Sequence, residues 1–162
     1  MTNQKITKSS EYFREVVEPN YKEFISNDSS FRTAFNLANA LFNMRDWVFR
    51  LEKADAEKIL GANFSNETQF WAFIEQQVPK AGYIRDVANA SKHVKLTKHP
   101  STSLTHVANT YISSGAFGAG GFGVGRFSAP TVMLEDQNND VSFDSCATDL
   151  FNFWKKLVAQ LP

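Results

Sequence analysis

Apolar side chains recur at three- and four-residue intervals over most of the chain up to residue 95, which is the periodicity of amphipathic helices. These segments cover about residues 9–25, 30–51, 54–60, 66–78 and 80–95. The strongest is 30–51, and a capping cluster at 27–29 precedes it. Pro19 is expected to kink or split the first helix, because proline cannot donate a backbone hydrogen bond. The chain up to residue 95 is therefore predicted to be helical.

The pattern changes after Pro100. Residues 105–114 are rich in β-formers, 115–125 hold six of the eight glycines, and strand-like composition returns over 127–135 and 141–143. A last amphipathic segment follows at 145–161, with Asp144 and Ser145 as its expected caps. We predict a single domain over 1–162, a mainly α (α+β) bundle of four to five helices. A Gly-rich β-hairpin at about 105–143 is inserted before the terminal helix at about 145–161.

Composition narrows the classes of function. Hydrophobic residues make up 43% of the 162 positions and include 15 Phe and three Trp, enough for one aromatic-rich core. The 17 basic and 17 acidic residues cancel, so any basic patch that attracts nucleic acid must be local. The single cysteine excludes an internal disulfide, and no apolar run is long enough to span a membrane. Residues 1–10 carry lysines without an apolar stretch, so we expect no export signal. We expect a soluble cytoplasmic protein that does not contact a membrane.

One polar stripe offers candidate chemistry. On a helical wheel for residues 85–93, Arg85, Asp86, Asn89, Lys92 and His93 fall within one arc, opposite an apolar face. Imidazole suits proton transfer near neutral pH, and the planar guanidinium suits phosphate oxygens. Any surface helix also carries a solvated polar face. The stripe is therefore either a functional surface or an ordinary solvated one.

Arg45 interrupts the apolar stripe of the segment 30–51. A buried charge is too costly to keep without a partner. Asp86, or Asp46 next to Arg45, could supply the carboxylate. A pair between Arg45 and Asp86 would make the two helices face each other, and it could be purely structural.

The Arg85-Asp86…His93 arrangement on a late helix of a helical bundle resembles the HEPN superfamily, whose ribonuclease members carry an Arg-polar-x…His signature. The resemblance covers about residues 10–95 and the terminal helix. It implies metal-independent RNA cleavage of the toxin or defence type, without a cofactor, in which His93 is the general base or acid and Arg85 holds the scissile phosphate. Asp86 matches the polar position after the Arg, and Asn89 and Lys92 add polar groups. The family's composite site further implies a homodimer.

A second hypothesis is a non-catalytic protein-interaction or regulatory domain. Seven residues separate Arg85 from His93, more than is usual in the HEPN family, and the net charge is zero. The Arg45–Asp86 region would then be structural, and the Gly- and Phe-rich segment 115–125 would dock a protein partner or a second copy of the chain.

Three shorter features are assigned structural roles. Gly118, Gly120 and Gly123 match a dinucleotide-binding pattern, but no helix start follows, so a hairpin tip is preferred. The stretch 136–140 (Asp-Gln-Asn-Asn-Asp) opens like a calcium loop but lacks its glycine and glutamate, so a hairpin turn is predicted. The helix N-terminus could lower the pKa of Cys146, although a lone cysteine is usually a small core residue.

Overall fold

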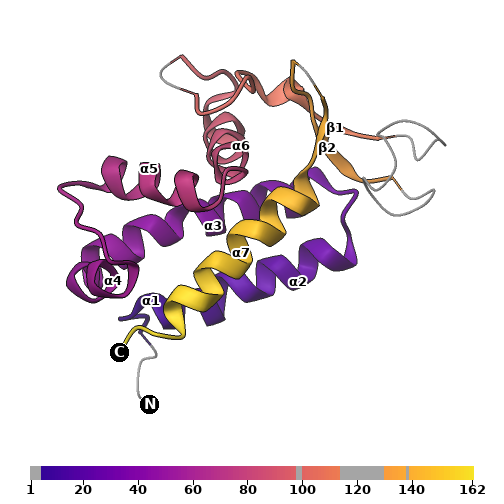
Figure 1. Cartoon of the computed structure of the whole chain (residues 1–162). Helices are drawn as coiled ribbons and strands as arrows, with labels where there is room; N and C mark the ends of the chain where they lie inside the picture. Colours follow the sequence, from indigo (N-terminus) through magenta and orange to yellow (C-terminus); the bar gives the residue numbers. More distant parts are fainter. Residues whose placement is uncertain (1–4, 98–99, 114–129, 138) are drawn as a thin grey trace.

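The computed structural model describes residues 5–97, 100–113, 130–137 and 139–162 (Figure 1). It confirms the predicted class, mainly helical with a small antiparallel sheet inserted before the terminal helix. The predicted Gly-rich tip at 115–125, with its Gly118–Gly123 pattern, lies outside the described residues. The elements in chain order are α1 (Ser9–Tyr12), the π-helix η1 (Phe13–Val17), α2 (Glu18–Ser26), α3 (Phe31–Leu51), α4 (Lys53–Leu60), α5 (Glu67–Gln77), α6 (Ala81–His93), the 3-10 helix η2 (Val107–Asn109), β1 (Thr110–Ile112), β2 (Val132–Leu134), β3 (Val141–Ser142) and α7 (Phe143–Val158).

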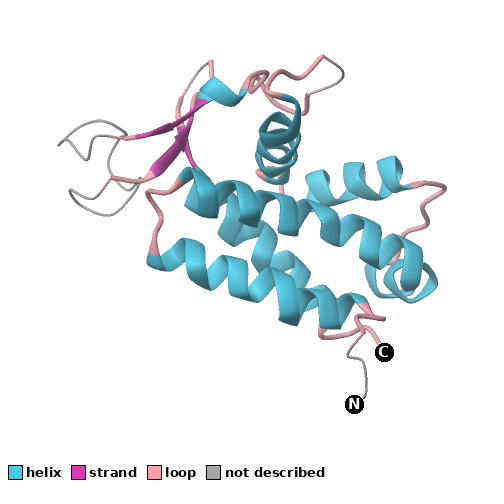
Figure 2. Ribbon diagram, turned by 180° about the vertical axis from the view of Figure 1, so that it is seen from behind, coloured by secondary structure: helices cyan, strands magenta, loops and turns pink. Residues whose placement is uncertain are grey.

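The long helix α3 is the centre of the packing and contacts α1, α2, α4, α5, α6 and α7. In Figures 1 and 2, α6 stands across the direction of α3 and rises out of the bundle. The sheet lies beside α6, where β2 and β3 contact α7. After α6 ends at His93, the chain comes back to the side of the same helix at Ser101 and Thr102, and only then enters β1.

The first helix shows how one residue changes local geometry. Pro19 does not break the helix; the chain instead widens into the π-helix η1 just before it. Pro19 cannot donate to the carbonyl of Glu15, and its ring crowds that carbonyl, which a wider turn relieves. The Asn20 side chain donates to the Val16 carbonyl at 2.8 Å and satisfies an acceptor there. The predicted kink or split is therefore a π-turn.

Helix ends follow local side-chain chemistry, but two of them differ by a few residues from the ends predicted from the sequence. The side chains of Ser30 and Asn66 accept the N-terminal hydrogen bonds of α3 and α5, so the cap of α3 is Ser30 and not the 27–29 cluster. Gly61 ends α4 with φ 65°, as expected for a glycine cap. The terminal helix begins at Phe143, before the predicted caps, and its N-cap residue is Ser142.

Aromatic side chains dominate the core, as the composition indicated. Tyr21 stacks on Phe151 with ring centroids 4.0 Å apart, and Phe42 meets Trp71 edge to face at 5.0 Å. Four further aromatic side chains are fully buried between the helices: Phe24, Phe70, Phe143 and Trp154.

The sheet has the order β1-β2-β3 with both pairs antiparallel. Residues 135–140 connect β2 to β3, so the stretch that resembles a calcium loop is the connection of a hairpin, as predicted. Tyr83 of α6 donates its hydroxyl to Asp136, and Tyr111 of β1 donates to Asp140. These two bonds fix both ends of the connection to the rest of the fold.

Candidate functional site

The polar stripe of α6 does not share one environment. Asp86 is fully buried, and the Arg85 side chain is 20% exposed. Asn89 is partly buried, whereas Lys92 and His93 are exposed at the end of the helix. Because an α-helix rises about 1.5 Å per residue, Arg85 and His93 are about 12 Å apart along the axis. The structure divides the stripe into a buried polar part and an exposed basic part.

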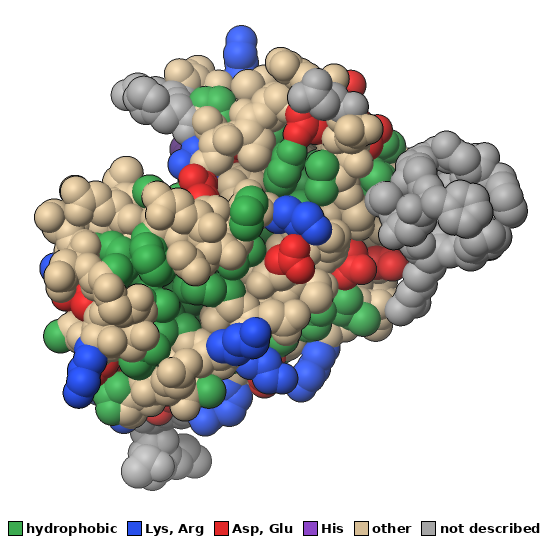
Figure 3. All heavy atoms as spheres, in the orientation of Figure 1, with side chains coloured by type: hydrophobic (Ala, Val, Ile, Leu, Met, Phe, Trp, Pro, Cys, Tyr) green, Lys and Arg blue, Asp and Glu red, His purple; other side chains and the backbone are tan. Residues whose placement is uncertain are grey.

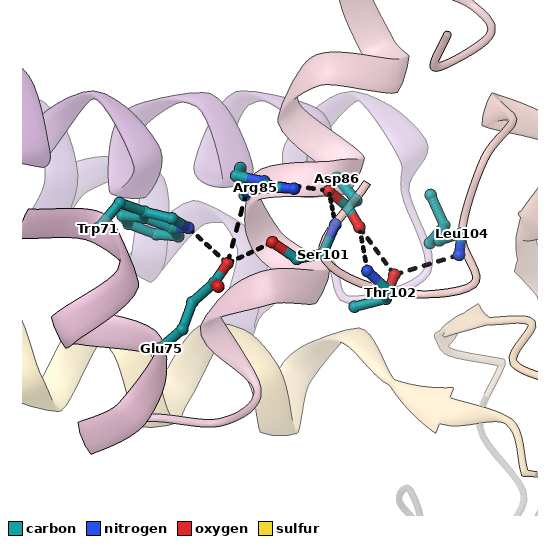
Figure 4. Close-up of polar contacts among 7 residues, drawn as sticks. All are labelled: Trp71, Glu75, Arg85, Asp86, Ser101, Thr102 and Leu104. Carbon is teal, nitrogen blue, oxygen red and sulfur yellow. Dashed lines mark hydrogen bonds and ion pairs between the residues drawn. The ribbon is translucent and has the colours of Figure 1, made fainter. Parts of the chain in front are cut away.

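The buried part centres on Asp86. Its carboxylate accepts hydrogen bonds from the backbone N–H groups of Ser101 at 3.1 Å and Thr102 at 2.7 Å, and from the Thr102 hydroxyl at 2.9 Å. Arg85 Nε lies 3.2 Å from the same carboxylate. These bonds tie the chain that follows α6 back onto the helix (Figure 4). We term Asp86, Ser101 and Thr102 the α6 latch.

Two opposing effects act on the Asp86 carboxyl. Burial raises its pKa, because the low-dielectric interior disfavours the charged form. The hydrogen bonds from Ser101 and Thr102, together with the charge of Arg85, oppose that rise. Burial is the largest of these effects, so the pKa of Asp86 lies above its ordinary value of 3.8.

Glu75 of α5 extends the same network. Its carboxylate accepts a hydrogen bond from Trp71 Nε1 at 2.6 Å and another from the Ser101 hydroxyl. It also lies 3.8 Å from Arg85 Nη1, so the guanidinium lies between two carboxylates (Figure 4). The position of Arg85 is thus determined by its contacts with α5 and with its own helix.

Gly82 lets the returning chain approach α6 closely. A Cβ atom added at Gly82 would lie 2.8 Å from the Cβ of Ser101, closer than two carbon atoms can pack. It would also lie 3.4 Å from both Glu75 Oε1 and Thr102 Cγ2. The glycine near the start of α6 is therefore required by the path of the latch.

The exposed part lies where α6 ends. Lys92, His93 and Lys95 are exposed, and none takes part in a salt bridge within the described part of the chain. We term residues 92–95 the basic turn. The negative end of a helix dipole favours cations, which by itself accounts for some basic side chains here.

Val94 gives the basic turn an unusual backbone. Its dihedral angles are φ 62° and ψ −46°, and it is 55% exposed. The Lys95 N–H donates to the His93 carbonyl at 2.6 Å, so Val94 is the central residue of a γ-turn. A β-branched residue is strained in this conformation, and strain of this kind persists only where the surrounding structure imposes it. The Val94 carbonyl accepts a hydrogen bond from Val107 at 2.7 Å, which ties the turn to η2.

Arg45 takes the nearer of its two expected partners. Its guanidinium lies 2.7 Å from Asp46 on the same helix and 4.6 Å from the centre of the Phe42 ring. The side chain of Arg45 is 21% exposed, so the pair keeps contact with solvent. Asp86 is bound by the latch instead, and the suggested Arg45–Asp86 pair does not form. Arg45 is therefore not joined to the network of Figure 4 by an ion pair.

The remaining candidate features are the Cys146 thiol, a metal site and a membrane-spanning helix. The Cys146 side chain is fully buried, which confirms the preferred interpretation as a small core residue. Burial raises the pKa of its thiol to about 12, so the alternative, a pKa lowered by the helix N-terminus, is not found. Within the described ranges, no group of three His, Cys, Asp or Glu side chains is placed to hold a metal ion. Among the described helices, none has both the length and the apolar character of a membrane span.

The partners of Asp86 in the latch were not predictable from the sequence pattern. Ser101 and Thr102 lie 15 and 16 residues beyond Asp86, a separation without helical or strand periodicity. Glu75 belongs to the preceding helix. The one local signal was Gly82, because glycine near the start of an otherwise regular helix often marks a close approach of another segment.

Comparison with protein-family models, with curated proteins and with solved structures found no match.

Proposed function

We propose that this chain is an RNA-directed, HEPN-like domain that binds the phosphate backbone of single-stranded RNA through the basic turn. The observation that carries the proposal is the exposed group Lys92, His93 and Lys95, which lacks acidic partners in the described chain and surrounds the strained Val94. Strained, exposed residues are concentrated at binding sites, where the fold maintains a conformation that the local sequence disfavours.

Charge explains why a local basic cluster matters in this protein. The net charge is zero, so long-range attraction cannot concentrate RNA at the surface. Contact must come from side chains that meet phosphates directly and release the counterions around them. Ammonium groups suit this role because they donate to phosphate oxygens as point charges.

The test is a comparison of two pairs of lysines. Replacement of Lys92 and Lys95 by alanine is expected to weaken binding of a labelled single-stranded RNA about tenfold at about 0.1 M salt. The matched control replaces Lys155 and Lys156, which are exposed on α7. In the view of Figure 3, Lys and Arg side chains gather over the C-terminal half of α7 and over the neighbouring α2. The control therefore removes the same charge from another basic surface. Fluorescence anisotropy over a salt series measures both pairs.

The salt dependence gives a second criterion. Each phosphate contact contributes a slope of about 0.7 to the logarithmic salt dependence for single strands, so the double replacement at the basic turn should reduce the slope by about 1.4. Equal losses in both lysine pairs, or no binding by the wild-type protein, would contradict the proposal.

A second candidate function is metal-independent cleavage of the bound RNA. It is favoured by the spacing of Arg85, Asn89 and His93, which lie on one side of α6 at four-residue intervals. In this reaction the His93 imidazole accepts the proton of a ribose 2′-hydroxyl, the oxygen attacks phosphorus, and the same imidazole, now protonated, gives that proton to the departing 5′-oxygen. The products are a 2′,3′-cyclic phosphate and a 5′-hydroxyl. Because about 12 Å separates Arg85 from His93 along one helix, the two groups would act from different copies of the chain in a homodimer.

Cleavage is tested in the presence of a chelator. The wild-type protein should convert RNA to cyclic-phosphate products, and His93→Ala should lower the rate by at least about a hundredfold if proton transfer is lost. The control is His106→Asn, because an asparagine oxygen can accept the Ala108 N–H as the His106 imidazole does. Equal activity of His93→Ala and wild type would exclude this function.

A further inference from the structure

The segment between α6 and η2 is held at two places. At the end near the basic turn, the Leu96 N–H donates to the Thr105 carbonyl and the Val107 N–H donates to the Val94 carbonyl, both at 2.7 Å. At the other end, Asp86 holds Ser101 and Thr102. The described parts of this segment, on both sides of residues 98–99, are therefore held in place, and the second part is held by a fully buried carboxylate.

The latch is continued inside the segment itself. The Thr102 hydroxyl donates to Asp86 and also accepts the N–H of Leu104 at 3.1 Å, so one side chain serves both sides of the turn. Ser103 donates to Asp136 at 2.7 Å, and Leu104 is fully buried. Loss of the Thr102 hydroxyl would remove the side-chain bonds on both sides of this turn.

Strain at Val94 connects the latch to the basic turn. A positive φ is unfavourable for valine and persists only while the chain on both sides of it is fixed. The helix fixes the preceding side, where the Val94 N–H donates to Ala90 at 2.7 Å. On the following side, the Val94 carbonyl accepts from Val107, where the segment that the latch holds at Ser101 and Thr102 returns to the end of α6. If that segment is released, Val94 can relax to a negative φ, and Lys95 then turns away from the end of α6.

We propose that Asp86 is a positioning residue for RNA binding: by holding Ser101 and Thr102 it keeps Val94 in its strained turn and so places Lys95 beside Lys92 and His93. Arg85, 3.2 Å from Asp86, assists by favouring the charged carboxylate that accepts these bonds. This inference rests on the proposed RNA binding at the basic turn. In this inference Arg85 supports RNA binding by stabilising the Asp86 carboxylate, without touching the RNA.

The experiment compares two threonines of the same segment. Thr102→Val keeps the side-chain shape and removes the hydroxyl that binds Asp86. Thr105→Val is the matched control, because the Thr105 side chain is exposed and makes no hydrogen bond in the described structure. Thr102→Ser restores a hydroxyl and serves as the rescue variant. Each protein is measured by hydrogen exchange of the amides at 95–104 and by anisotropy with the same labelled RNA.

We expect the latch amides to exchange about tenfold faster in Thr102→Val, since a bond to a carboxylate contributes about 1.5 kcal/mol or more. RNA affinity should fall about fivefold or more in Thr102→Val, stay within about twofold in Thr105→Val, and recover in Thr102→Ser. Unchanged exchange in Thr102→Val would overturn the latch. Faster exchange with unchanged RNA affinity would overturn the positioning role and leave RNA binding intact. Failure of the wild-type protein to bind RNA would overturn the proposed function and this inference together.

Discussion

Replacement of Asp86 by alanine is expected to lower the free energy of unfolding by about 3 kcal/mol. The substitution leaves two backbone N–H groups, the Thr102 hydroxyl and the Arg85 guanidinium without the carboxylate that they contact. Each of these donors would then be buried without a hydrogen-bond acceptor, so the free-energy cost of removing it from water is no longer offset. This cost is the largest part of the expected loss of stability. Urea unfolding followed by circular dichroism measures the change, with the slope checked for constancy.

The matched control is Asp149→Ala. Asp149 lies on α7, is 49% exposed, and forms an ion pair with Lys80 at 3.2 Å. Exposed pairs of this kind contribute about 0–1 kcal/mol. If both aspartate variants lost the same stability, burial and the latch bonds would not be the source of the effect.

The pH dependence of the Asp86 effect has a defined sign. Because the pKa of Asp86 is raised above 3.8 in the folded protein, the folded state binds the proton more tightly than the unfolded chain. This contribution to stability is fully present below pH 3.8 and is lost as the pH rises through the folded-state pKa. The difference between wild type and Asp86→Ala should therefore be larger at about pH 3.5 than at about pH 7. A smaller difference at acid pH would mean that the hydrogen bonds outweigh burial.

Gly82→Ala is expected to destabilise the protein by about 2 kcal/mol, against the preference of helices for alanine. In an unobstructed helix interior, alanine is favoured over glycine by about 1 kcal/mol. At this position the new Cβ would lie 2.8 Å from the Ser101 Cβ, so the latch segment must move. Thermal or urea unfolding gives both the sign and the size of the change.

The clash is tested by removal of the opposing atom. In the background of Ser101→Gly, which lacks the Cβ that Gly82→Ala would meet, the same substitution should become neutral or stabilising. The double-mutant cycle separates this contact from the bond that Ser101 gives to Glu75. An unchanged cost in the Ser101→Gly background would place the strain elsewhere in α6.

The sequence by itself determined the helices and their order. Helical periodicity predicted α3, α5, α6 and α7 to within a few residues, because each buries a stripe that recurs every three to four positions. Gly61 and Asn66 cap the end of α4 and the start of α5, and the groups that each cap serves lie within the same turn. The change of pattern after Pro100 likewise predicted the inserted sheet. These features depend on neighbours close in the chain.

Tertiary structure decided which polar side chains of the stripe on α6 are buried and which are exposed. A helical wheel assigns Asp86 and Lys92 to one face, yet the returning segment buries the first and leaves the second in solvent. Periodicity describes a helix face but not which distant segment covers part of it.

Tertiary contacts also overrode local preference at Val94. Valine avoids positive φ, so no local rule would place it in a γ-turn, but its bonds to Ala90 and Val107 impose one. Likewise, only the path of Ser101 explains why Gly82 has no side chain. The sequence thus determined which segments are helices and which side chains can be charged. The return of the chain over α6 decided which of those charges are bound inside the fold and which are available to a ligand, because that return depends on contacts between residues far apart in the chain.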